Sequence, residues 1–176
     1  MMQKLSETAI IEKIKRAEPI VAELADGSLK IIIRAYVPYI ATAIHSGHKL
    51  RRSLQKTITL TDKDRLYEED PYTNHFAKAF PIALIAQDSR YEYDLNRSPE
   101  TCIYDTAWGQ KVWKKPLTAI QKNNSLEKHK KYYRILSALT NKLEKLHGTC
   151  LLMDFHSYNY TDRGYQDPPT FNIGTE

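Results

Sequence analysis

Residues 151–160 read LLMDFHSYNY, and this stretch decides how the fold is interpreted. Its apolar start predicts a buried strand over 149–155, which ends beside Asp154 and is followed by His156. Open α/β sheets bind their ligands at the carboxyl ends of their strands. The stretch therefore indicates one of two things. His156 is either a simple strand-end histidine paired with Asp154, or part of a ligand site.

A second predicted strand ends in the same way. Residues 39–44 are apolar, and His45 follows them in the sequence YIATAIHSGH. The start of a predicted helix between the two histidines supplies three consecutive acidic residues: Glu68, Glu69 and Asp70. Two imidazoles and one carboxylate, with a fourth position open, are typical of a catalytic zinc site. The chain has six histidines, so spacing alone also allows His45 to be a loop histidine bonded to backbone.

The other predicted elements alternate between helix and strand. The first half of the chain predicts a helix from Ser6 to about Ala17, two strands within 20–36 around Asp26-Gly27, and a long loop over 48–70. The second half predicts a helix with Asp70 as N-cap and Pro71 as first residue, a strand within 82–89, and an irregular region to about 122. The last predicted helix runs from Ser125 to Gly148, with Leu136, Leu139, Leu143 and Leu146 on one face. N-caps, turn residues and apolar periodicity support these boundaries. The alternation predicts an α/β fold of three layers.

Composition indicates an ordinary globular chain. Hydrophobic residues make up 41% of the 176 positions, which is enough to form the core of one domain. No apolar run approaches the roughly 20 residues of a membrane span, and the N-terminus lacks the apolar core of a signal peptide. We therefore expect a cytoplasmic protein without a membrane partner. Two cysteines are too few for a disulfide framework, and their place outside any C-x-x-C pair argues against cysteine zinc sites.

The excess positive charge is concentrated in one stretch. Residues 111–145 hold ten Lys or Arg against two acidic residues, a net charge of +8 within a chain of net charge +5. Such a stretch can attract nucleic acid. It contains no recognised nucleic-acid motif, so the favoured interpretation is a solvated helix face and nucleic acid is not the expected partner.

Five motifs in the same order resemble the N-formylglutamate amidohydrolase family. The segment SRYEYDLNRSPE at 89–100 is similar to the family signature. The other four are AIHSGH, EEDPYT, LLMDFHSY and FNIGT, and together the five extend over roughly residues 39–175. The combination is much more specific than any one of the motifs.

The resemblance implies a set of zinc ligands. They are His45, Asp70 and His156, with Glu69 as the alternative carboxylate. Imidazole nitrogens and carboxylate oxygens are the ligands that zinc takes in catalytic sites. Asp154 would then orient His156 or a neighbouring backbone group.

The resemblance also implies that Asn96 and Arg97 hold the carboxylate of a small-molecule substrate. The guanidinium is a planar fork that matches a carboxylate, and the amide beside it adds donors. The alternative for Arg97 is an ion pair with Asp94 or Glu100.

The implied activity is zinc-dependent hydrolysis of an N-formyl amino acid, foremost N-formyl-L-glutamate, to formate and the free amino acid. The same centre could act on another N-acyl amino acid or a peptide terminus. The implied fold is a single domain over 1–176, with a mixed, mostly parallel sheet of the zinc-dependent exopeptidase (phosphorylase/hydrolase-like) type.

One feature departs from the family pattern. Family members continue into a further strand whose glutamate would be the general base, whereas this sequence stops at Glu176. We therefore expect a domain truncated at its C-terminal end and leave the catalytic base unassigned. Glu69, His48 and Glu176 are the candidates within the chain. The alternative is a non-catalytic relative that binds metal and a carboxylate ligand.

Overall fold

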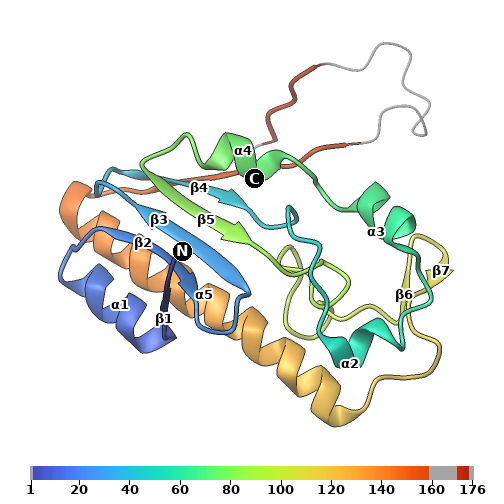
Figure 1. Ribbon diagram of the computed structural model, residues 1–176. Coiled ribbons are helices and arrows are strands. Elements are labelled where there is room, and N and C mark those ends of the chain that lie inside the picture. The colour runs from blue at the N-terminus through green and yellow to red at the C-terminus, as the bar shows by residue number, and fades with distance from the viewer. Residues whose placement is uncertain (1, 159–169, 175–176) are drawn as a thin grey trace.

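A six-stranded mixed sheet forms the centre of the computed structural model, which describes residues 2–158 and 170–174 (Figure 1). The strand order is β1-β2-β3-β5-β4-β8. The bounds are β1 Gln3–Leu5, β2 Ile20–Leu24, β3 Leu29–Ile33, β4 Tyr39–Ala43, β5 Ile82–Ala86 and β8 Leu151–Asp154. Strand β3 runs antiparallel to both its neighbours, and the other three pairs are parallel. The expected mixed sheet is confirmed.

Helices cover both faces of this sheet. Figure 1 shows α1 (Glu7–Lys15) and the long α5 (Ala119–His147) on one face and the short α4 (Thr73–Ala77) on the other. Beyond the carboxyl ends of β4 and β5 lie α2 (Arg52–Gln55), α3 (Asp62–Glu68) and the hairpin of β6 (Thr106–Ala107) and β7 (Gln110–Lys111). The three-layer α/β/α architecture is confirmed. No helix in the described residues is long and apolar enough to cross a membrane.

Unequal cores on the two faces explain the unequal helices. On the α1 and α5 face, long aliphatic side chains from helices and strands form one large buried cluster that includes Ile10, Ile14, Ile31, Ile33, Ile135, Leu139 and Leu143. On the opposite face, alanines predominate in a small cluster with Ile32 and Ile85. Small side chains let the single short helix α4 pack closely, and Phe80 and Phe155 complete that layer. Strand β5 is buried at all five positions because it lies between both layers.

Three predicted helix boundaries are wrong. The expected loop at 48–70 contains α2 and α3, and Thr61 starts α3 with a capping box. The helix after Asp70 begins at Thr73, because the Asp70 carboxylate faces histidines and does not cap the helix. Helix α5 begins at Ala119 after the N-cap Thr118, so Ser125 lies buried inside the helix.

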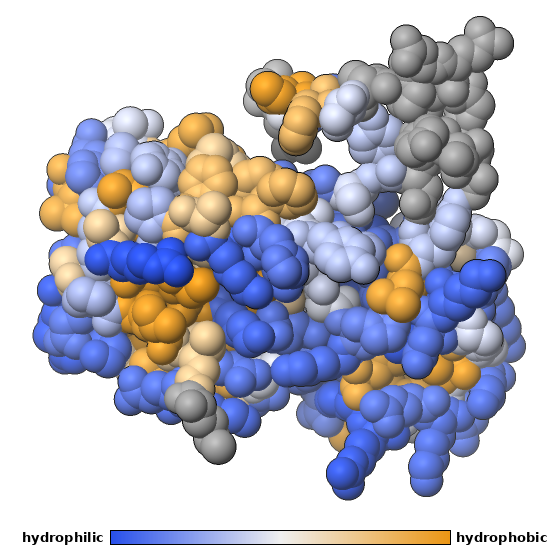
Figure 2. Space-filling model, turned by 45° about the horizontal axis from the view of Figure 1, so that its top comes forward, coloured by the Kyte–Doolittle hydropathy of each residue, from blue (hydrophilic) through white to orange (hydrophobic). Residues whose placement is uncertain are grey.

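Two predictions of burial are also wrong. Leu146 at the end of α5 is 49% exposed, while Leu139 and Leu143 are buried as expected. Strand β8 was expected to be buried, yet Leu151 and Leu152 are 58% and 46% exposed. The reason is its place at the edge of the sheet, where it pairs with β4 alone among the described strands. Figure 2 shows hydrophobic patches divided by hydrophilic side chains on the face of the molecule turned forward.

Gly47 allows the segments after β4 and β5 to pack together. A Cβ at this position would lie 2.3 Å from the carbonyl carbon of Gln87 and 2.5 Å from the oxygen of Asp88. The neighbouring Lys49 exchanges backbone hydrogen bonds with Gln87 and Ser89, at 3.0 and 2.8 Å. Only glycine fits such an approach of backbone to backbone. The contact fixes the loop that carries His45 against the segment that begins at Ser89.

Candidate metal centre

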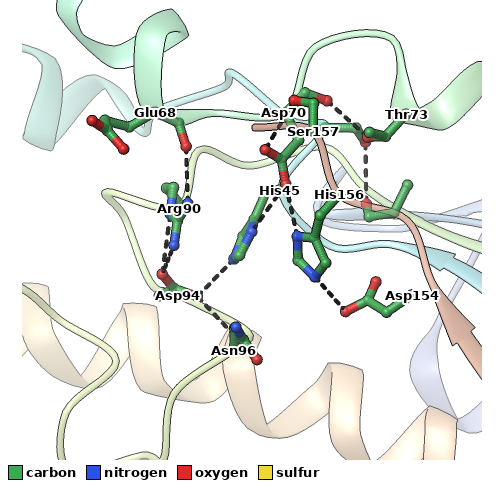
Figure 3. Close-up of polar contacts among 12 residues, drawn as sticks. His45, Glu68, Asp70, Thr73, Arg90, Asp94, Asn96, Asp154, His156 and Ser157 are labelled. Atoms are coloured by element: carbon green, nitrogen blue, oxygen red, sulfur yellow. Dashed lines mark hydrogen bonds and ion pairs between the residues drawn. The ribbon is translucent and has the colours of Figure 1, made fainter. Parts of the chain in front are cut away.

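Two parallel strand ends bring the predicted histidines together. Strands β4 and β8 pair in register, with Thr42 opposite Asp154, so His45 and His156 leave the sheet side by side. Their ring centroids are 5.0 Å apart. Asp70 joins them because its backbone N–H donates to the carbonyl of His45 at 3.0 Å. One ligand atom from each of the three residues lies within 4.8 Å of the others (Figure 3).

Both imidazoles turn the same nitrogen toward Asp70. Asp70 Oδ2 lies 2.8 Å from Nδ1 of His156 and 3.3 Å from Nδ1 of His45. The other carboxylate oxygen accepts a hydrogen bond of 3.1 Å from the hydroxyl of Ser157. The two Nδ1 atoms and the Asp70 carboxylate therefore converge on one point.

A second carboxylate contacts the far nitrogen of each ring. Nε2 of His45 lies 2.7 Å from Asp94 Oδ1, and Nε2 of His156 lies 3.0 Å from Asp154 Oδ2. Thr42 holds Asp154 in turn, with its hydroxyl 2.6 Å from Asp154 Oδ1. A histidine that binds a metal commonly donates its other N–H to a carboxylate, which fixes the tautomer and the ring orientation. The predicted contact between Asp154 and His156 is present.

The polar atom that best tests the fit of a metal is Nδ1 of His45. His45 is 1% exposed, and within the described residues this nitrogen forms no hydrogen bond, although Asp70 Oδ2 lies 3.3 Å away. When Nε2 donates to Asp94, a neutral ring leaves a lone pair on Nδ1, and burying such an acceptor without a partner costs free energy. Two imidazole nitrogens and a carboxylate are a donor set that suits zinc. The residues therefore fit a divalent metal ion.

The charges of the cluster are mutually dependent. Burial alone would raise the pKa of Asp70, but the hydrogen bond with His156 and the nearby imidazole of His45 outweigh it and hold that pKa well below its ordinary value. Hydrogen bonds with Asp154 and then Asp70 raise the pKa of His156 to about 10. A metal takes a neutral imidazole, so binding at this position would release the proton of His156.

Glu69, the alternative carboxylate, points elsewhere. It is 3% exposed and bonds to Nδ1 of His48 and to the hydroxyl of Ser89. Nη1 of Arg65 lies 3.5 Å from Oε1 of Glu69, the oxygen that also accepts from Ser89. These contacts separate Glu69 and His48 from the two converging imidazoles, so the geometry favours Asp70 as the ligand.

Asn96 and Arg97, the residues expected to bind substrate, line a pocket beside the cluster. The pocket has a volume of about 630 Å³ and lies between the 96–99 segment and α5, where His129, Lys130, Tyr133 and Arg134 complete its wall. It adjoins the candidate centre because the Asn96 backbone N–H donates to Asp94 at 2.7 Å (Figure 3). Of the three cations in the wall, Lys130 and Arg134 pair with Glu127 and Glu7, which leaves Arg97 as the cation best placed for an anionic ligand.

The side chain of Arg97 is not committed to the acidic neighbours considered for it. Asp94 forms its ion pairs with Arg90 and His45, and Arg97 is exposed and forms no ion pair with Asp94 or Glu100. Its guanidinium can therefore meet a ligand in the pocket.

Sequence reasoning missed the importance of Asp94 and Arg90. Asp94 is 0% exposed, and Arg90 holds it through Nε at 3.1 Å and Nη2 at 2.7 Å. Arg90 itself donates to the carbonyl of Glu68 and lies under the ring of Trp108. The available signal was the spacing of four between an arginine and an aspartate in SRYEYD. That signal is weak, because it is equally common on solvated helices.

The basic stretch at 111–145 is largely the surface of α5. Several of its cations pair with acidic residues elsewhere in the fold, as Lys131 does with Asp26 and Arg134 with Glu7. These pairs agree with the favoured interpretation of a solvated helix face.

Comparison with known proteins gave one match. Residues 37–176 match the model of the family described as N-formylglutamate amidohydrolase. The matched range contains all the residues of the candidate centre and the pocket residues Asn96 and Arg97. No curated protein and no solved structure matched the chain.

Proposed function

Because the chain belongs to the N-formylglutamate amidohydrolase family, we propose that it hydrolyses the amide bond of an N-acyl amino acid at a metal held by His45, Asp70 and His156. The first candidate substrate is N-formyl-L-glutamate, with formate and glutamate as products. The observation that carries the proposal is the buried Nδ1 of His45, which forms no hydrogen bond within the described residues and lies 3.3 Å from Asp70 Oδ2.

Zinc is the expected metal, and when bound it would supply Lewis acidity that activates water and polarises the scissile carbonyl. The chain's own residues do the rest. With the metal bound, Asp94 and Asp154 would hold the Nε2 protons of His45 and His156 and leave both Nδ1 lone pairs for the metal. Arg97 and Asn96 would anchor the substrate carboxylate in the adjoining pocket.

A second candidate function is binding of metal and a carboxylate ligand without rapid turnover. Among the described residues, the acids that contact the two imidazoles are already hydrogen-bonded to them. Two of the candidate bases, Glu69 and His48, bond to each other, and Glu176 lies outside the described residues. A positioned general acid–base group typically contributes about 10²–10⁴-fold to the rate, so its identity decides how fast this chain turns over.

Formate release from N-formyl-L-glutamate is the direct test. We expect release that disappears on chelation and returns when zinc is added back. A panel of N-acetyl and N-succinyl amino acids and short N-formyl peptides would define the acyl group and the leaving group. A protein that binds zinc and glutamate yet releases no acid from any substrate in the panel would establish the second candidate function instead.

Arg97→Lys should weaken binding of the substrate carboxylate. An ammonium cannot reproduce the two parallel hydrogen bonds of a guanidinium. Loss of one charge-assisted bond corresponds to about 10–100-fold in affinity. The measurement is the KM for N-formyl-L-glutamate together with the Kd for glutamate.

The matched control for this substitution is Arg16→Lys, at an exposed arginine that pairs with Glu18 away from the pocket. Equal affinities for Arg97→Lys and this control would contradict the proposed anchor. Loss of folding in Arg97→Lys would instead mark Arg97 as structural.

A further inference from the structure

Arg90 joins the two segments that position His45 and Asp70 (Figure 3). Its Nε and Nη2 donate to Asp94 Oδ2 at 3.1 and 2.7 Å, and the other oxygen of that carboxylate lies 2.7 Å from Nε2 of His45. Its Nη1 donates at 2.9 Å to the carbonyl of Glu68, two residues before Asp70. One guanidinium therefore helps to fix the spacing between two of the three candidate ligands.

The ring of Trp108 covers a face of that guanidinium. Cζ of Arg90 lies 4.8 Å from the centroid of the ring. The hydrogen bonds of a guanidinium lie in its plane and leave its faces free, and a cation over an aromatic face is attracted by the ring. The indole therefore holds Arg90 in a direction in which its two acceptors cannot.

The turn that carries Trp108 is strained. Trp108 and Gly109 join β6 to β7, and their φ angles are 48° and 76°. Two-residue turns of type I′ have positive φ at both positions, and asparagine, aspartate or glycine usually takes the first. A bulky residue there is an outlier, which persists only when its surroundings hold it. Edge-on contacts with Tyr91 and Tyr104, at 5.8 and 5.7 Å between centroids, and the contact with Arg90 hold the indole.

We propose that Trp108 is a positioning residue of the candidate metal centre, whose indole holds the guanidinium of Arg90 in place between its two acceptors. This role deepens the proposed function and rests on the metal centre proposed there. Without the ring, water can compete for the donors of Arg90, and His45 and Asp70 are no longer held at a fixed spacing. Metal affinity should then fall although no ligand has been changed.

Trp108→Leu tests the proposal, because it keeps an apolar side chain at the same strained position and removes the aromatic face. Replacing an outer partner of a metal ligand typically costs about 10–100-fold in metal affinity. Since Trp108 acts one contact further out, we expect a loss of about 3–10-fold in zinc affinity, below that range. Trp108→Phe keeps an aromatic face and should stay within about twofold of the unsubstituted protein. The measurements are competition with a chromophoric chelator and the visible absorption spectrum of the Co²⁺ protein, which reports ligand geometry.

Two further variants separate the ring from the turn and from the fold. Trp108→Asn relieves the strain of the turn but still removes the ring, so it should lose zinc affinity as Trp108→Leu does. Tyr36→Leu removes a half-buried ring before β4, at the opposite end of that strand from His45. It should lower the free energy of unfolding and leave zinc affinity unchanged. A role of Trp108 in packing alone would give this same result.

A readout without metal keeps this inference separate from the proposed function. In the metal-free protein, NMR can follow the Nε2 proton that His45 donates to Asp94. We expect this proton to exchange with water about 3–10-fold faster in Trp108→Leu than in Tyr36→Leu, because local opening sets the exchange rate. If the unsubstituted protein bound no zinc, the proposed function would fail, and the exchange rate would still decide the role of Trp108.

Two results would overturn the role of the indole. One is zinc affinity and proton exchange in Trp108→Leu equal to those in Trp108→Phe. The other is full zinc affinity in Trp108→Asn, which would show that the turn matters and the ring does not. If Trp108→Leu did not fold, Trp108→Asn would take its place in both measurements.

Discussion

Replacing His45 with alanine is expected to remove tight zinc binding from the protein. His45 is the most buried of the three converging ligands, and within the described residues its Nδ1 forms no hydrogen bond that could replace a bond to the metal. Removing an outer partner of a ligand already costs about 10–100-fold, so removing the ligand itself should cost at least about 100-fold. His156→Ala should have an effect of the same order. Metal content of the purified protein and competition with a chelator measure both.

The matched control is His75→Ala. His75 is an exposed histidine on α4, and its ring contact is with Tyr72 and not with the cluster. Zinc content should be unchanged in this variant. If zinc content survived both His45→Ala and His156→Ala, the metal would be bound elsewhere and the proposed centre would be wrong.

The sequence predicts this centre because its three residues follow local signals. His45 and His156 each come directly after an apolar strand, and parallel neighbours in a sheet place such residues at one edge. The choice between Glu69 and Asp70 could not be made in the same way. Adjacent residues in an extended segment point in opposite directions, and only the contacts of Glu69 with His48 and Ser89 show which of the two faces the imidazoles.

Long-range contacts explain what sequence reasoning missed. Asp94 lies 49 positions from His45, and their hydrogen bond depends on the packing of the 89–97 segment against the loop at Gly47. The start of α5 was misplaced for a related reason. Ser125 has the composition of an N-cap, but in the fold its hydroxyl accepts a hydrogen bond of 2.7 Å from Arg51 inside the helix. Local propensity cannot show that a polar residue serves a tertiary contact.

Glu92→Ala is expected to destabilise the fold by about 3–5 kcal/mol, the usual cost of breaking a buried ion pair by removing one partner. Glu92 is 0% exposed and accepts from Arg51 at 2.6 Å and from Lys128 at 3.0 Å. Alanine would leave the half-buried Arg51 guanidinium without its carboxylate. Lys128 would keep only Asp88, whose pKa is already raised by burial. The free energy of unfolding in urea measures the loss.

Glu100→Ala is the control for this substitution, because Glu100 is exposed in the same segment and should change stability by less than about 0.5 kcal/mol. Equal stabilities for the two variants would show that the buried charges contribute nothing net. The expected large loss has a consequence for the site. Through Lys128, Glu92 joins α5 to the segment that carries Arg90 and Asp94, so Glu92→Ala should also lower zinc affinity under conditions where it remains folded. A variant that lost stability but kept full zinc affinity would show that Arg90 positions Asp94 without help from α5.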